Sequence, residues 1–373
     1  MPPPKKAVKK AVKRAVKKAG PKAASSVLEM LTKELSGAPV PSLESLTRTV
    51  QASLVIAVLQ PWLSLQDSHV FALDSDSGQR WYCIVMGAAK EVFGLQAYRG
   101  DAGFALFDDI QNDRLADSAE FLARQDLFTI EFVRRTEYTP LDRALLALSP
   151  DPAPPGTLVP HLRVSRPTLF PWYPQAPDVE EINDCLMAAL LFFEWLAKHP
   201  TAKPWAKAGE LPLLTHWSTD LTVTQIPHPP RPAPDRPSPT KLDERRINQL
   251  LAKVPSRSAG HPVEADVFLL RSAMRDDGLP YFPWMALAAD SSEGYLFPPV
   301  VDGHAKREDV LLDCVLGALE HSPYRPAAYH VRDEFCRKAL DPIAQIFGIP
   351  IKIADLPAIA EARTALESQM VGR

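Results

Sequence analysis

The sequence predicts an α+β protein with two mixed-sheet domains and a disordered, basic N-terminal tail. Short apolar runs with strand-like alternation are interspersed with longer segments of helical periodicity along the 373 residues. A proline-rich stretch, PHPPRPAPDRPSP at 227–239, can continue neither a helix nor a sheet, so it divides the chain. We therefore predict a tail at 1–25, a first domain at 26–226, a linker at 227–240 and a second domain at 241–373.

The tail repeats a basic tetrad, KKAV-KKAV-KRAV-KKAG, over residues 5–20. Crowded like charges oppose helix formation, so we expect the tail to stay disordered until it meets an anion. One interpretation is a non-specific nucleic-acid arm, because neutralising phosphates requires only charge. The other is a solubilising extension without a partner. The cations that would contact nucleic acid are Lys5, Lys6, Lys9, Lys10, Lys13, Arg14, Lys17 and Lys18.

The rest of the chain is acidic, because nine of the 42 Lys and Arg lie within the first 22 residues while the formal net charge is -3. An acidic body does not attract DNA or anionic lipid by itself. The basic start has no apolar segment behind it, which argues against a secretory signal. The most apolar window, Leu186–Ala197, is too short to span a membrane and contains Glu194. We predict a cytoplasmic protein with no membrane span.

The cysteines are far apart in apolar runs and form no paired metal-binding motif, which is typical of reduced, buried thiols: Cys83, Cys185, Cys314 and Cys336. No other motif in the chain indicates a bound metal or cofactor, and we predict neither.

The first domain is built around the stretch Trp81–Phe107, which reads as a β-hairpin leading into a helix. Two helices precede it, at Ser26–Leu35 and Leu43–Leu59. Strands are predicted at His69–Leu73, Arg80–Met86, Phe93–Tyr98, Leu127–Arg134 and His161–Ser165, with strand-like alternation over Glu210–Ile226. Helices are predicted at Asp101–Asn112, Pro140–Leu148 and Asp178–His199.

The second domain is predicted to follow the order βββαβαβα after a connecting helix at Lys241–Lys253. Its predicted elements are a meander of strands at Val267–Met274, Tyr281–Ala289 and Gly294–Val301, a helix at Arg307–His321, a strand at Ala327–Val331, a helix at Glu334–Phe347, a strand at Pro350–Ala354 and a helix at Pro357–Gln369. This order resembles that of ribonuclease H-like folds in topology only, and one fold serves many functions.

An active ribonuclease H-like nuclease gathers carboxylates around two metal ions. The resemblance places these acids in the middle of the first strand, in the first helix, at the end of the fourth strand and in the last helix. Candidates here are Glu308 or Asp313, Asp333 and Glu361. The predicted first strand offers Arg271 and has Asp266 only at its edge, so the sequence favours an inactive domain. The alternative role of these acids is in helix caps and solvated helix faces, with Asp333 capping the helix that follows it.

Strand ends that lead into helices are common ligand positions in α/β sheets. Arg99 and Asp101 follow a strand of the first domain, and Arg332 and Asp333 follow a strand of the second. These four residues form our binding-site hypothesis. The alternative is that they form structural Arg–Asp pairs.

The two halves also echo one another. Asp184-Cys-Leu-Met-Ala-Ala-Leu190 is similar to Asp313-Cys-Val-Leu-Gly-Ala-Leu319, and Leu73-Asp-Ser-Asp-Ser-Gly78 is similar to Ala289-Asp-Ser-Ser-Glu-Gly294. An old duplication would explain both matches, although turn chemistry alone can produce the second.

The motif from Gly87 to Gly103, the proline-rich linker, Val331-Arg-Asp333 and Phe347-Gly-Ile-Pro-Ile351 together resemble a bacterial two-domain family of unknown function. The resemblance implies the fold and brings no catalytic residues. Our leading hypothesis is a non-catalytic interaction or regulatory protein with an unidentified protein partner. The alternatives are a divergent metal-dependent nuclease or nucleotide-handling enzyme, and a nucleic-acid-associated protein that binds through its lysine-rich tail.

Overall fold

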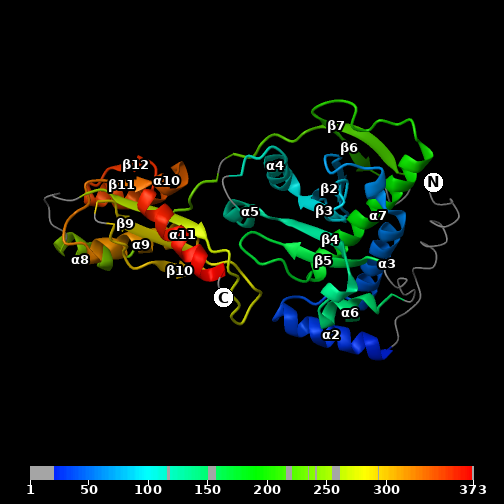
Figure 1. The fold of residues 1–373 in the computed structure, drawn as a ribbon, viewed down its shortest axis with the longest axis horizontal. Helices are drawn as coiled ribbons and strands as arrows, with labels where there is room; N and C mark the ends of the chain where they lie inside the picture. Colours follow the sequence, from blue (N-terminus) through cyan, green and yellow to red (C-terminus); the bar gives the residue numbers. More distant parts are fainter. Residues whose placement is uncertain are drawn as a thin grey trace. The chain divides into compact units, whose positions relative to one another are not determined.

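The computed structural model describes residues 21–115, 118–149, 157–215, 221–233, 235–239, 242–253, 261–292 and 294–371. The lysine tetrads of the tail lie outside these residues. Contacts divide the chain into two units, which are labelled by element in Figure 1. Unit 1 comprises Met1–Pro232 with Arg275–Pro280, and unit 2 comprises Ala233–Met274 with Tyr281–Arg373.

Unit 1 contains a seven-stranded mixed sheet in the order β5-β4-β3-β2-β1-β6-β7. Only β1 and β6 are paired in parallel, and every other neighbouring pair in this sheet is antiparallel. The strands are β1 (Phe71–Asp74), β2 (Arg80–Met86), β3 (Gly94–Arg99), β4 (Leu127–Val133), β5 (Val159–Ser165), β6 (Glu210–Thr215) and β7 (Thr222–Pro227).

Helices cover both faces of this sheet, so its central strands are buried on both sides. In β2, Trp81, Cys83 and Val85 pack against α3 (Leu43–Leu59) and α7 (Ala176–Lys198). The alternate residues Tyr82 and Ile84 pack against α4 (Gly100–Gln111). A smaller core joins α2 (Pro21–Leu35) to α6 (Pro140–Leu146). Short elements complete the unit: η1 (Pro61–Leu63), η2 (Arg135–Glu137) and α5 (Ser118–Arg124), which was not predicted.

Unit 2 contains a five-stranded sheet in the order β10-β9-β8-β11-β12. The strands are β8 (Val263–Leu269), β9 (Trp284–Asp290), β10 (Val300–Asp302), β11 (Tyr329–Val331) and β12 (Ile351–Ile353). The central strand β8 pairs antiparallel with β9 and parallel with β11. The α+β class and the predicted βββαβαβα order are therefore confirmed.

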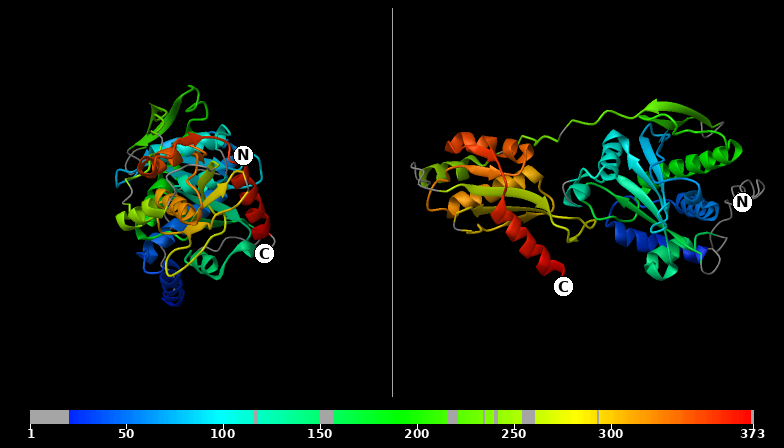
Figure 2. Two further views of the ribbon diagram at one scale, coloured as in Figure 1. Left: turned by 90° about the vertical axis from the view of Figure 1, so that its left-hand side faces the viewer. Right: turned by 45° about the horizontal axis from the view of Figure 1, so that its top comes forward.

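The helices of unit 2 also form two layers. One face of the sheet packs against α8 (Glu244–Lys253), α9 (Arg307–His321) and α10 (Glu334–Phe347). The other face packs against α11 (Pro357–Val371), the red helix in Figure 2, through Ile359, Phe268 and Met285. Alternate residues of β8 consequently point to different layers.

The predicted position of the first strand of this sheet is wrong. The strand was predicted at Val267–Met274 and lies at Val263–Leu269, so Glu264 and Asp266 are inside it and are almost fully buried. The backbone N–H of Ile359 donates a hydrogen bond of 3.0 Å to Glu264 Oε2. Tertiary contacts therefore stabilise two carboxylates that sequence alone places outside a buried strand.

Of the two pairs of similar segments in the two halves, one pair lies at equivalent positions in the two folds. The Asp184–Leu190 motif lies on α7, which precedes β6, the parallel neighbour of β1. The Asp313–Leu319 motif lies on α9, which precedes β11, the parallel neighbour of β8. The other match joins a β1–β2 turn to the segment after β9, which is not an equivalent position.

All four cysteines are buried with free thiols. Within the described residues, no helix has the length and apolar character that crossing a membrane requires.

Candidate functional site

Four elements of unit 2 bring charged side chains to one place. Asp266 lies in the middle of β8, and Arg332 and Asp333 directly follow β11. Because Val331 pairs in parallel register with Ala265, the next residues Arg332 and Asp266 lie beside each other. Two further arginines come from the start of α9 and from α11. We call the five residues the arginine–aspartate cluster: Asp266, Arg307, Arg332, Asp333 and Arg363.

The charges of the cluster alternate along a chain of ion pairs. Asp266 Oδ2 lies 3.5 Å from Arg332 Nη1 and 3.9 Å from Arg363 Nη1. Asp333 Oδ2 lies 3.6 Å from Arg332 Nε and 3.3 Å from Arg307 Nη2. Arg332 thus contacts both acids, and three guanidinium groups share two carboxylates.

The two acids differ in burial and in pKa. Asp266 is 2 % exposed, and burial raises its pKa above the ordinary value although Arg332, Arg363 and Arg307 favour the ionised form. Burial also opposes the ionisation of Asp333. There, the N–H hydrogen bond from Cys336 and the charges of Arg307 and Arg332 prevail, so the pKa of Asp333 is lowered. Asp333 is also the N-cap of α10, where it accepts from Cys336 N at 2.8 Å.

Aromatic rings support two of the arginines. The guanidinium carbon of Arg307 lies 4.1 Å from the centroid of the Phe335 ring. That of Arg363 lies 4.2 Å from the centroid of the Phe268 ring. Such stacking orients the planar donor fork before any ligand arrives.

The other acids proposed for catalysis have different surroundings. Glu308 accepts a 2.9 Å hydrogen bond from the backbone N–H of Ser238 in the proline-rich segment. Asp313 pairs with Arg246 of α8, and Glu361 is exposed on α11. Over the described ranges, no group of three or more His, Cys, Asp or Glu is arranged to hold a metal ion.

Comparison with protein families finds one domain model on each side of the proline-rich segment. Residues 48–212 match the model of a domain of unknown function, DUF7309, and residues 247–367 match that of another, DUF6930. The protein is a two-domain protein of unknown function. The resemblance predicted from sequence is confirmed at this level. No curated protein matches the chain. The arginine–aspartate cluster lies wholly within the DUF6930 domain.

In the DUF7309 domain, the predicted site residues Arg99 and Asp101 have separate partners. Arg99 lies over the ring of Trp81 and contacts Asp126 at 3.6 Å and Glu181 at 3.4 Å. Asp101 accepts a 2.8 Å hydrogen bond from the hydroxyl of Tyr82. Burial is the largest cause that raises the pKa of Tyr82, and the contact with Asp101 raises it further. These contacts favour the alternative that Arg99 and Asp101 have a structural role, in which each charge is paired within the fold.

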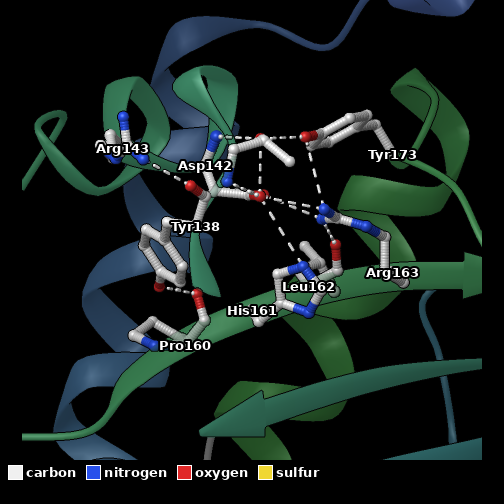
Figure 3. Close-up of polar contacts among 9 residues, drawn as sticks. Tyr138, Asp142, Arg143, Pro160, His161, Leu162, Arg163 and Tyr173 are labelled. Carbon is white, nitrogen blue, oxygen red and sulfur yellow. Dashed lines mark hydrogen bonds and ion pairs between the residues drawn. The ribbon is translucent and has the colours of Figure 1, made fainter. Parts of the chain in front are cut away.

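A second polar network in the DUF7309 domain, shown in Figure 3, centres on Asp142 of α6. Arg163 donates to both carboxylate oxygens of Asp142, at 2.9 and 3.0 Å, and its guanidinium lies over the Tyr173 ring. Thr139 caps α6 through the Asp142 N–H and also lies 2.7 Å from the Tyr173 hydroxyl. Sequence reasoning missed this network, although the spacing Thr139-Pro-Leu-Asp142 indicates a helix start.

The cavity beside this network is small. It has a volume of about 30 Å³ and is lined by Asp142, Thr49, Ser53 and surrounding apolar side chains. A cavity of this size holds about two water molecules and no organic ligand. The cavity offers the network around Asp142 no room for an organic ligand, and we take the arginine–aspartate cluster as the stronger candidate site.

Proposed function

We propose that the DUF6930 domain is a non-catalytic binding domain and that the protein acts in interaction or regulation with a protein partner. The observation that carries this proposal is the identity of the residues around Asp266. The topology resembles a ribonuclease H-like fold, and Asp266 occupies the middle of its first strand. Arginines from the first helix, the end of the fourth strand and the last helix surround it.

These arginines oppose divalent cations. A two-metal site needs carboxylates to offset the charge of the ions. A guanidinium about 6 Å from a divalent cation repels it by about 5 kcal/mol at an effective dielectric constant of about 20. Three such groups offset a large part of the attraction that Asp266 and Asp333 would exert on the ion. The observed position of β8 places Asp266 in the middle of the first strand, but the surrounding arginines still disfavour the nuclease alternative.

The contacts of the remaining acids support the same view. Asp333 is engaged as the cap of α10, and Glu308 accepts from the proline-rich segment. A metal ion would have to displace both contacts. We infer that these acids serve the fold.

Calorimetric titration of Mn²⁺ and Mg²⁺ into the full chain tests this proposal, together with assays for hydrolysis of single-stranded DNA, double-stranded DNA and RNA. We expect no saturable metal binding and no hydrolysis, with circular dichroism confirming that the protein is folded. Metal binding and hydrolysis that are both lost in Asp266→Asn and Asp333→Asn, and kept in the control Asp341→Asn on the exposed side of α10, would overturn it.

A further inference from the structure

The arginine–aspartate cluster carries one more positive than negative charge. It contains Arg307, Arg332 and Arg363 but only Asp266 and Asp333, and all five lie within one connected set of ion pairs. The separations of 3.5 and 3.9 Å from Asp266 to its two arginines are longer than charge-assisted hydrogen bonds, which are usually 2.7–2.9 Å.

Arg307 supplies a second, independent observation. Its Nε is buried and has no hydrogen-bond partner among the described residues. A buried N–H without an acceptor is costly, and arginine at the start of a helix is also unfavourable for the helix dipole. Arg307 nevertheless keeps this position at the start of α9, stacked over Phe335. A bound anion beside the guanidinium group would compensate for its unfavourable position in the helix dipole.

We propose that the arginine–aspartate cluster binds the phosphate group of a phosphorylated ligand, an inference that rests on the proposed non-catalytic function. Three guanidinium groups from α9, β11 and α11 match an anion with three equivalent oxygens better than a carboxylate with two. The rings of Phe335 and Phe268 pre-orient two of the three donors, which lowers the entropic cost of binding.

Asp266 moderates the site in this proposal. Its carboxylate contacts both Arg332 and Arg363, neutralises part of their charge when no anion is bound, and repels the incoming phosphate. Neutralising Asp266 should therefore strengthen binding. This behaviour is opposite to that of a catalytic or metal-binding acid, whose loss abolishes function.

Titration calorimetry of inorganic phosphate into the full chain, at constant ionic strength, is the direct test. We expect saturable binding that weakens by at least about tenfold in Arg332→Gln, because a charge-assisted hydrogen bond is lost. Arg332→Lys, which keeps the charge but loses the fork, should be intermediate. Asp266→Asn should bind severalfold more tightly. Arg337→Gln, which removes an arginine of α10 paired with Glu334, should leave affinity unchanged.

Three parallel titrations identify the ligand. Acetate tests a carboxylate, O-phosphoserine tests a phosphorylated side chain, and a nucleoside monophosphate tests a nucleotide. Phosphate binding that is absent from the wild type, unaffected by both Arg332 variants, or matched by acetate would overturn the proposal. Thermal unfolding of each variant excludes misfolding as the cause. If phosphate binding fails and metal binding is also absent, this proposal is wrong but the proposed non-catalytic function still holds.

Discussion

Arg332 Nη1 lies 3.5 Å from Asp266 Oδ2, and the parallel pairing of β11 with β8 creates this contact. The aspartate is almost fully buried, whereas the arginine is partly exposed. A buried acid thus faces a cation at the end of the neighbouring strand. The charge of Arg332 favours the ionised form of this acid against the effect of burial.

The ion pair between Asp142 and Arg163 is predicted to be a major contribution to the stability of the DUF7309 domain. Both side chains are largely buried, and Asp142 also caps α6. Asp142→Ala leaves Arg163 without its carboxylate, so we expect a loss of about 3–5 kcal/mol in the free energy of unfolding, measured by urea denaturation.

Asp108→Ala is the matched control, because Asp108 forms an ion pair with Arg114 in which both side chains are exposed. It should change the free energy of unfolding by no more than about 1 kcal/mol. Equal losses in the two variants would show that burial does not determine the strength of the Asp142 contact.

The DUF7309 domain is predicted to lose stability as the pH falls, and protonation of His161 accounts for part of this loss. Burial and the charge of Arg163 lower the pKa of this imidazole below its ordinary value of 6.5. The unfolded chain therefore binds the proton first as the pH falls. The contribution of His161 to stability is complete above pH 6.5 and is lost as the pH falls through the folded-state pKa.

Urea unfolding at several pH values between about 7.5 and 5 checks this sign. His161→Gln should lose less stability than the wild type over that range. The pKa of His69 is also lowered by burial, so His69 should contribute separately to the loss of stability at low pH, and His69→Gln should remove that contribution. A wild-type slope that neither variant reduces would assign the pH dependence to other groups.

Gly94 of β3 is predicted to tolerate no side chain. A Cβ there would lie 2.6 Å from the carbonyl oxygen of Ile130 and 2.7 Å from Met86 Cε. The backbone oxygen is fixed by strand pairing, so Gly94→Ala should lower the free energy of unfolding by about 1–3 kcal/mol. Thermal or urea unfolding gives the measurement.

Gly317 of α9 provides the contrast. Its Cβ would approach only the end of Arg246, at 4.0 Å. Alanine favours a helix over glycine by about 0.5–1 kcal/mol, so Gly317→Ala should stabilise the protein. Destabilisation by both substitutions would contradict the packing difference between the two glycines.

The sequence predicted the periodic elements closely and the central strand poorly. Strong helical periodicity gave the bounds of α3, α9 and α10, and a continuous apolar run rich in aromatic and β-branched residues gave those of β2. The strand that lies at Val263–Leu269 was predicted at Val267–Met274, and its first half contains two carboxylates that are unusual in a buried strand. Strand-end reasoning did identify Arg332 and Asp333, the two cluster residues that follow β11.

The remaining members of the cluster were not predicted. Arg307 and Arg363 lie on helices whose faces toward Asp266 depend on packing rather than on local spacing. One sequence signal was present, since an arginine at the start of a helix opposes the helix dipole. Asp266 was placed at the edge of a strand because the strand was predicted to begin at Val267, and the true bounds bury it.

By itself, the sequence determined the α+β class and the βββαβαβα order of the second half, because periodicity acts locally. The division at the proline-rich segment stays a prediction that rests on the local effect of proline. Only the tertiary structure decided which charges meet. Parallel pairing of β8 with β11 and the packing of α9 and α11 join residues far apart in the chain. Their mutual pairing makes the burial of Asp266 tolerable and gives the cluster its excess of positive charge.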